Sequence, residues 1–388
     1  MDLSNVRIRE HFGIVTNDTS TSQLGFLISP PKNRESIEKQ DIVCFDHPKR
    51  GDACQVLAEV NEITSYDEVA GSTIGERVGR LRATAHIIGY FDLRSDRRPL
   101  QKLLIPPHPG SRVYVPYAEF LQDLFSRGAE GKPYKTPLQL GKTEIAAASK
   151  EAGDEQLSFF LDSDDLNSKN TLISAVDGAG KTYTAKVIIE ELLNKTRSSI
   201  VVIDPNNEYA AETTVVEKDH TPPFDFQKIT INLDSSKNSE DQIVKKIKQN
   251  QLVAVTGENL TLEEKNKSYS RILNALAGYR RQKTTPQFVL VAEEAENLSP
   301  QAIQENLYVK NSATVLITSH PSLLGGETLS KVQTQIVGRT ADPKDITYLK
   351  NVIGNSHEQL PSLGVGEMVI NSLNIMRPTK IQVRQRLS

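Results

Sequence analysis

The chain has 388 residues, enough for about two or three domains, and its 37% hydrophobic and 24% charged residues are typical of a folded, water-soluble protein. Its 46 Lys and Arg residues against 49 Asp and Glu residues give a net charge of −3, which excludes a polycation, so any nucleic-acid surface must be local. The two cysteines, Cys44 and Cys54, argue against a disulfide framework and favour a reducing cytoplasm, and the lack of a long apolar run argues against membrane insertion.

Residues 1–116 are predicted to form a small β-barrel. Short apolar runs of strand length lie at residues 12–15, 25–28, 41–45, 55–60 and 83–91, and turn-forming Pro, Asn, Asp and Gly residues separate many of them. Several short strands at close spacing are typical of such a barrel. His86 lies within one apolar run, so we expect it to be a buried histidine that is not a ligand.

Residues 117–137 are predicted to connect two domains, with a short helix over 118–125 and a stretch rich in Gly, Lys and Pro after it. From residue 138 to 388, apolar runs of strand length alternate with segments of helical periodicity. This alternation is typical of a mainly parallel sheet covered by helices. The sequence therefore predicts an α/β protein in which a barrel precedes a sheet domain.

A phosphate-binding loop is predicted at residues 175–182. The apolar run 171–174 leads into the sequence Ala-Val-Asp-Gly-Ala-Gly-Lys-Thr, and helical periodicity follows. In this order of strand, small-residue loop and helix, backbone N–H groups converge on phosphate oxygens, Lys181 reaches the β- and γ-phosphates, and the Thr182 hydroxyl ligates Mg²⁺. Ala175 stands where glycine is usual, and the alternative is a glycine-rich turn that precedes a lysine by chance. The expected cofactors are ATP and Mg²⁺, and the expected binding residues are Asp177, Gly178, Ala179, Gly180, Lys181, Thr182 and Tyr183.

Acidic residues follow two later strands. Asp204 ends the apolar run 199–203, and Glu208 lies in the turn after it, so both are either near the nucleotide or only caps of that turn. Glu293 and Glu294 follow the apolar run 288–292. Phosphoryl transfer to water needs one acid for the Mg²⁺ shell and one for the water, so we assign Glu293 to Mg²⁺ and Glu294 to the water. The alternative is that this pair begins an exposed loop.

Two further strand ends carry candidate residues. The run 314–318 ends in polar residues, and we expect it to lie beside the phosphate-loop strand and to offer a γ-phosphate sensor. Arg339 follows the run 335–337. Its guanidinium is either an arginine finger that completes the active site of a neighbouring subunit or a structural ion-pair partner.

Taken together, these motifs resemble the HerA-type ATPases of the HerA/FtsK group, and the resemblance covers most of the chain. Residues 204–209 are similar to the family's Asp-Pro-x-x-Glu-Tyr segment, residues 293–297 to its Glu-Glu-Ala-His-Asn strand end, and residues 318–322 to its Ser-Gln-Arg-Pro-Ser segment. Residues 13–15 and 107–110 look like the family's HAS-barrel and its exit. The chain departs from the family at Ala175, Glu296 and Ser319-His320, and residues 305–310 lack the usual arginines.

The resemblance implies a HAS-barrel followed by a RecA-like P-loop ATPase domain. It further implies a hexameric, cytoplasmic DNA translocase or helicase that acts on double-stranded DNA, with a NurA-type nuclease as partner in DNA end processing and repair. Two alternatives stay open. One is a ring-forming relative that hydrolyses ATP poorly and serves as a scaffold or regulator, and the other is a motor that moves a protein or a non-chromosomal substrate.

Overall fold

The protein is described here by a computed structural model that covers residues 6–7, 11–28, 37–66, 80–143, 157–196, 198–209, 227–233, 243–244, 247, 251–257, 260–283 and 287–387. The chain forms two compact units. The first consists of Met1–Tyr134 and Thr143–Ser158, and the second of Lys135–Lys142 and Phe159–Ser388. The domain limits expected at residues 116 and 137 stay a prediction.

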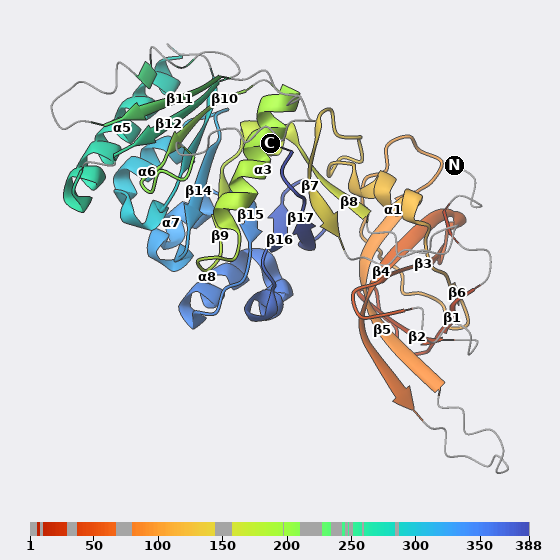
Figure 1. Ribbon diagram of the computed structural model, residues 1–388. Helices are drawn as coiled ribbons and strands as arrows, with labels where there is room; N and C mark the ends of the chain where they lie inside the picture. The colour runs from red at the N-terminus through yellow and green to blue at the C-terminus, as the bar shows by residue number, and fades with distance from the viewer. Residues whose placement is uncertain are drawn as a thin grey trace. The chain divides into compact units, whose positions relative to one another are not determined.

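The first unit is built on an antiparallel sheet that is nearly closed into a barrel (Figure 1). Its elements are β1 (Gly13–Val15), β2 (Gln23–Ile28), β3 (Ile42–His47), β4 (Gly51–Tyr66), β5 (Arg80–Asp92), β6 (Arg112–Val113) and α1 (Ala118–Phe125). The strand order is β3-β4-β5-β2-β1-β6. Tyr114, which follows β6, exchanges two backbone hydrogen bonds of 2.8 Å with Cys44 of β3. This exchange joins the two ends of the sheet, so the predicted small barrel is confirmed.

Strand alternation decides which side chains fill the barrel. Phe26, Phe45 and Val56 are fully buried in its core. His86 is exposed, although Ala85 and Ile87 on either side of it are buried. Successive residues of a strand point to opposite faces of the sheet, so His86 lies on the outer face. The expectation of a buried His86 is therefore wrong.

The second unit is an α/β domain around one large sheet. Its strands are β7 (Pro137–Thr143), β8 (Leu157–Asp162), β9 (Thr171–Ser174), β10 (Ser199–Ile203), β11 (Gln227–Asn232), β12 (Gln251–Thr256), β13 (Phe288–Ala292), β14 (Thr314–Thr318), β15 (Thr334–Val337), β16 (Glu367–Ser372) and β17 (Thr379–Val383). Its helices are α2 (Ser163–Asn167), α3 (Lys181–Thr196), α5 (Leu262–Gln282), η3 (Ala295–Asn297), α6 (Pro300–Leu307), η4 (Pro321–Leu324), α7 (Gly325–Ser330), α8 (Pro343–Ile353) and η5 (Gly354–Ser362). Among the residues that the structure describes, no helix has the length and apolar character needed to cross a membrane.

The strand order of this sheet is β11-β12-β10-β13-β14-β9-β15-β16-β17-β7-β8. The strands from β11 to β15 are parallel to their neighbours, and β16, β17 and β7 continue the sheet in antiparallel pairs. Strand β9 therefore lies between β14 and β15, and β13 lies on the far side of β14. The predicted mainly parallel sheet is confirmed.

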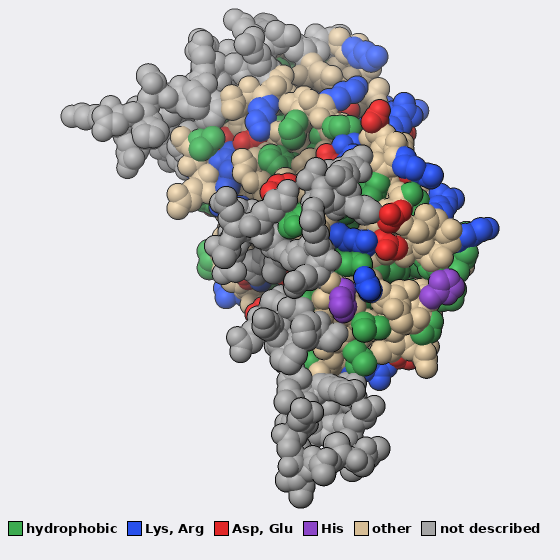
Figure 2. All heavy atoms as spheres, turned by 90° about the vertical axis from the view of Figure 1, so that its right-hand side faces the viewer, with side chains coloured by type: hydrophobic (Ala, Val, Ile, Leu, Met, Phe, Trp, Pro, Cys, Tyr) green, Lys and Arg blue, Asp and Glu red, His purple; other side chains and the backbone are tan. Residues whose placement is uncertain are grey.

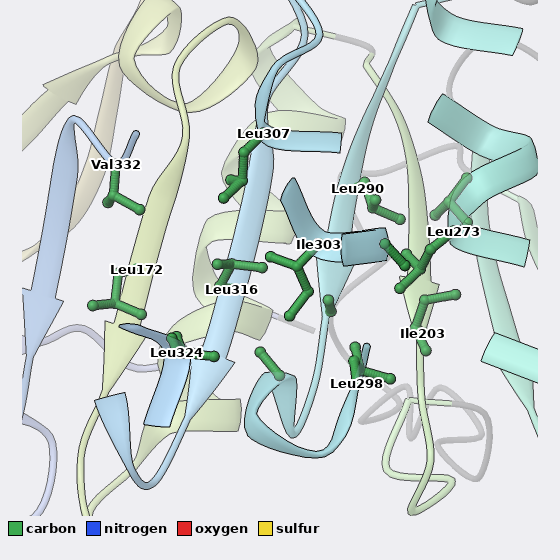
Figure 3. Packing of buried hydrophobic residues seen from close by; sticks show 14 of the residues in the cluster. Leu172, Ile203, Leu273, Leu290, Leu298, Ile303, Leu307, Leu316, Leu324 and Val332 are labelled. Carbon is green, nitrogen blue, oxygen red and sulfur yellow. The ribbon is translucent and has the colours of Figure 1, made fainter. Parts of the chain in front are cut away.

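Helices cover both faces of the sheet, which explains why the central strands β9, β10, β13 and β14 are buried along their whole length. On one face, α5, α6 and α8 pack against alternate strand residues such as Leu172, Ile203 and Leu316 (Figure 3). On the other face, α3 packs against the intervening residues, such as Ile173 and Val202. The sheet is thus held rigidly from both sides, and the loops at its carboxyl edge are free to carry function.

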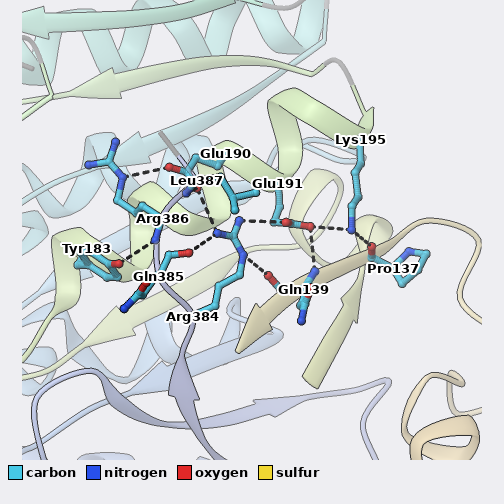
Figure 4. Close-up of polar contacts among 10 residues, drawn as sticks. All are labelled: Pro137, Gln139, Tyr183, Glu190, Glu191, Lys195, Arg384, Gln385, Arg386 and Leu387. Atoms are coloured by element: carbon cyan, nitrogen blue, oxygen red, sulfur yellow. Dashed lines mark hydrogen bonds and ion pairs between the residues drawn. The ribbon is translucent and has the colours of Figure 1, made fainter. Parts of the chain in front are cut away.

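Helix α3 is fixed along its length by the segment that follows β17 (Figure 4). Its Glu190 and Glu191 are both buried, with 4% of each residue exposed. Nη1 of Arg384 lies 3.3 Å from Glu190 Oε2, and Nη2 lies 3.0 Å from Glu191 Oε1. Arg386 adds a 3.0 Å contact from Nε to Glu190 Oε1, and Lys195 Nζ lies 2.9 Å from Glu191 Oε2. One guanidinium therefore bridges two buried carboxylates.

Replacing Arg384 by alanine should destabilise the second unit by about 3 kcal/mol, because it leaves buried carboxylates without their shared cation. Chemical denaturation measures the change. The matched control is Arg281→Ala, which removes an exposed ion pair with Glu305 and should cost at most about 1 kcal/mol. Equal losses in the two variants would contradict a structural role for Arg384.

Candidate active site

The loop of residues 175–180 lies between the end of β9 and the start of α3 at Lys181. Gly178 and Gly180 have φ angles of +76° and +107°, which side chains disfavour. Both strands beside β9 hold the loop, since Val176 N–H donates to Arg339 O at 2.8 Å and Ala175 N–H donates to Thr318 O at 3.4 Å. The backbone is therefore folded as a phosphate-binding loop requires.

Ala175, which stands where glycine is usual, is accommodated by a neighbouring glycine. It has no positive φ angle, so the alanine is not strained there. A Cβ atom placed on Gly338 would lie 2.9 Å from the Ala175 methyl group, which is closer than two carbon atoms tolerate. Gly338 thus leaves the space that the methyl group fills, and the departure at Ala175 does not disrupt the loop.

Lys181 lies in a polar network at the mouth of the loop. Its Nζ atom is 2.9 Å from Asp177 Oδ1, and the Ser319 hydroxyl donates to the same oxygen at 2.6 Å. The Ser319 hydrogen bond, together with the charge of Lys181, lowers the pKa of Asp177. The backbone N–H of Ser319 donates to Glu296 Oε1 at 3.1 Å. Because β14 pairs with β9, the polar end of β14 lies beside the loop, where a γ-phosphate sensor is needed.

The two acids after β13 occupy different environments. Glu293 has 7% of its surface exposed, and its Oε1 accepts a 2.6 Å hydrogen bond from the Tyr209 hydroxyl. Burial raises the pKa of Glu293 to about 7; the Tyr209 hydrogen bond and the charge of Lys181 oppose this rise, while Glu208 and Asp204 add to it. Because β13 and β9 both pair in parallel with β14, the acids after β13 and the phosphate-binding loop after β9 lie at the same edge of the sheet.

Glu294 has a left-handed backbone, with a φ angle of +48°, and it is only partly buried. Its Oε1 accepts a 2.6 Å hydrogen bond from the Asn206 amide, and its Oε2 accepts one of 3.2 Å from the Asn297 amide. The change in backbone direction separates the two neighbouring carboxylates, so that Glu293 is buried and Glu294 is partly exposed. A division of roles between them remains the prediction.

Asp204 is fully buried, and its carboxylate caps the turn that follows β10. Its Oδ1 accepts the Glu208 N–H at 2.8 Å, and its Oδ2 accepts the Tyr209 N–H at 2.9 Å. Glu208 itself is exposed. Asp204 therefore shapes the turn that carries Tyr209 to Glu293, and a direct contact of Asp204 with nucleotide stays a prediction.

Arg339 follows β15, and Tyr183 lies in the first turn of α3. Arg339 is partly buried, and its carbonyl group holds the loop of its own chain through Val176. Tyr183, exposed on the first turn of α3, accepts a 2.8 Å hydrogen bond from the Arg386 N–H through its hydroxyl. The structure thus brings all the predicted site residues to the region where β9, β10, β13, β14 and β15 end.

Thr182 and Glu293 supply a hydroxyl and a carboxylate oxygen, which are the hard donors that Mg²⁺ prefers. Among the described residues, no group of three or more His, Cys, Asp and Glu side chains can hold a metal ion. Mg²⁺ in nucleotide sites is usually held by one or two protein oxygens together with phosphate oxygens and water. The donors present therefore fit Mg²⁺ that arrives with a nucleotide.

Sequence reasoning missed the contact between Tyr209 and Glu293. The two residues are 84 positions apart, but their strands β10 and β13 are hydrogen-bonded neighbours. One feature of the sequence did indicate that Tyr209 matters. It ends the segment 204–209, which resembles the family's Asp-Pro-x-x-Glu-Tyr segment. Only the strand order shows which acid this tyrosine meets.

The raised pKa of Glu293 predicts how the stability of the metal-free protein depends on pH. Its pKa rises from the usual 4.5 to about 7 on folding, so between these pH values the folded protein keeps a proton that the unfolded chain has lost. The free energy of unfolding should therefore fall as pH rises from about 4.5 to about 7, by up to about 3 kcal/mol. Denaturation in EDTA should show this fall in the native protein but not in Glu293→Gln. Parallel pH curves for the two proteins would contradict it.

The chain is similar in sequence to several known proteins. Residues 149–310 match the family model described as "Helicase HerA, central domain". The chain is 28% identical over 195 residues to a probable helicase of Methanocaldococcus jannaschii, a match that covers 45% of this chain and 34% of the relative. A second probable helicase of the same organism is 23% identical over 155 residues, covering 39% of this chain and 25% of the relative. The chain thus spans less than half of the length of these relatives.

Solved structures of low sequence identity are also similar to the chain. VirB4 of Thermoanaerobacter pseudethanolicus has 14% identity and a TM-score of 0.45, with 65% of this chain and 97% of that chain covered. The genome packaging NTPase B204 of Sulfolobus turreted icosahedral virus 2, in complex with ATPγS, has 16% identity and a TM-score of 0.40, with 57% and 98% covered. The family-model match confirms the expected resemblance: residues 149–310, most of which lie in the second unit, are similar to the central domain of HerA helicases.

Proposed function

We propose that this chain hydrolyses ATP and uses the energy to move along double-stranded DNA as a translocase or helicase. The observation that carries this proposal is the convergence of a phosphate-binding loop, a polar strand end and two acids on neighbouring strands β9, β14 and β13. The family-model match over residues 149–310 and the two probable helicases among its relatives support the DNA substrate.

The residues of the site divide the work of phosphoryl transfer. The loop N–H groups and Lys181 bind the phosphates and neutralise the charge that develops on them. Thr182 and Glu293 would hold Mg²⁺, which would supply positive charge to stabilise the phosphoryl oxygens. Glu294, partly exposed and held by Asn206 and Asn297, orients and deprotonates the attacking water. A guanidinium such as that of Arg339 stabilises the transition state.

The assembly and the cellular role are part of the same proposal. A translocase of this type encloses DNA, so we propose a homo-oligomeric ring, a hexamer, that works in the cytoplasm. A NurA-type nuclease that receives the DNA would place the protein in DNA end processing and repair. On the face drawn in Figure 2, Lys and Arg side chains of the described residues are spread among acidic and polar ones.

Duplex DNA should stimulate ATP turnover, and its affinity should fall by about 10³-fold between 50 and 200 mM salt, because a ring grips phosphates rather than bases. Titration of two unrelated duplexes across ionic strength, beside ATPase assays with and without DNA, measures both effects. A strong sequence preference at constant salt would contradict the translocase. ATP turnover without any effect of DNA would favour a motor for a protein or other non-DNA substrate.

A weakly hydrolysing scaffold or regulator is the second candidate. It is favoured by residues 305–310, which lack the arginines usual in the family. Within this segment Glu305 forms an ion pair with Arg281 of α5, which is a surface contact and not a catalytic one. Ring assembly on ATP with no DNA-stimulated turnover would select this candidate.

A further inference from the structure

Tyr209 contacts the acid that we assign to the metal. Its hydroxyl donates a 2.6 Å hydrogen bond to Glu293 Oε1, and both residues are buried, with 3% and 7% of their surfaces exposed. A phenol is a neutral donor, so it holds a carboxylate in place without cancelling its charge. A buried hydrogen bond of this length to a carboxylate is of the strong, charge-assisted kind.

The backbone around Tyr209 is itself held firmly. Asp204 accepts the N–H groups of Glu208 and Tyr209 at 2.8 and 2.9 Å, which fixes the turn after β10. Lys186 of α3 donates to the Glu208 carbonyl at 3.1 Å, and its Nζ lies 5.2 Å from the centre of the Tyr209 ring. Since α3 begins at Lys181, Tyr209 links the helix of the phosphate-binding loop to the acid after β13.

We infer that Tyr209 is a positioning residue for the metal site: it occupies Oε1 of Glu293 and thereby directs Oε2 toward the Mg²⁺ that Thr182 would share. This inference rests on the proposed ATPase function. Partners that orient a ligating side chain usually change metal affinity or activity by about 10- to 100-fold when they are removed. A tyrosine that only fills space would change neither, because phenylalanine fills nearly the same volume.

The test is Tyr209→Phe, which removes one oxygen atom. The matched control is Tyr269→Phe, because Tyr269 is equally buried, at 1% exposed, and its hydroxyl has no hydrogen-bond partner among the described residues. For each protein, Mn²⁺ binding to the ADP complex is measured by electron paramagnetic resonance, and nucleotide binding is measured separately in EDTA. The Mg²⁺ concentration for half-maximal ATP turnover gives a second, independent reading.

Tyr209→Phe should weaken Mn²⁺ binding and raise the half-saturating Mg²⁺ concentration by about 10- to 100-fold, while its nucleotide affinity in EDTA stays within about twofold of the native value. Tyr269→Phe should match the native protein in all three measurements. If Tyr209→Phe does not fold, Lys186→Met, which loosens the same turn, should shift the metal readings in the same direction.

Two results would overturn the inference: unchanged metal binding in Tyr209→Phe, or an equal loss in Tyr269→Phe. Both leave the proposed function intact, because the native protein would still bind nucleotide and respond to metal. A native protein that binds no nucleotide at all would instead remove the proposed function, and the two failures are therefore distinguished by the native control.

Discussion

Lys181→Ala is expected to abolish ATP turnover and to weaken nucleotide binding. The side chain extends from the first residue of α3, where its charge adds to that of the helix N-terminus, and in a phosphate-binding loop a lysine at this position reaches the β- and γ-phosphates. Its ion pair with Asp177 shows that the ammonium group already meets a negative group at the mouth of the loop. ATPase assays and titration with a fluorescent ATP analogue measure the two effects.

The control for this variant is Lys350→Ala, since Lys350 is an exposed lysine near the end of α8. It should bind and hydrolyse ATP as the native protein does. Turnover that persists in Lys181→Ala would show that residues 175–182 form an ordinary glycine-rich turn, and the assignment of the whole site would fail with it.

Arg339→Ala is expected to keep ATP binding and assembly but to lose about 10³- to 10⁵-fold in turnover, as removal of an arginine finger does. The contact of Arg339 with the loop runs through its backbone carbonyl, so the substitution leaves that hydrogen bond to Val176 in place. The loss should therefore come from the guanidinium alone. A variant that unfolds, or one that turns over ATP normally, would assign Arg339 to a structural role.

Mixing this variant with Glu294→Gln decides whether the guanidinium acts between subunits. Glu294→Gln should bind ATP without hydrolysing it, because the amide keeps the shape of the side chain but cannot accept the proton. If each site takes Arg339 from a neighbour, some interfaces of a mixed ring pair an intact Glu294 with an intact Arg339, and part of the turnover returns. A mixture that assembles without any recovery would contradict a role in the neighbouring site, since the backbone of Arg339 already lies beside its own loop.

The sequence determined the local elements of the site. The order of strand, small-residue loop and helix around Lys181 predicted the phosphate-binding loop, and continuous apolar runs ending in acids predicted buried parallel strands such as β10 and β13. These features depend on neighbouring residues, because glycines, periodicity and chain direction act over a few positions. The ordered motifs added the HerA-type resemblance, which the family-model match over residues 149–310 confirmed.

Only the tertiary structure decided which of these elements meet. Strand order depends on how crossovers pack on the sheet, so the chain alone did not show that Tyr209 reaches Glu293 or that Ser319 reaches Asp177. The sequence also did not show that Gly338, which has no side chain, leaves the space that the Ala175 methyl group fills. For His86 the sequence pattern was misleading. The apolar run around it indicated burial, but alternate residues of a strand point to opposite faces of the sheet, and the side chain of His86 points to the outer face. Contacts between distant segments are set by packing, which no local pattern records.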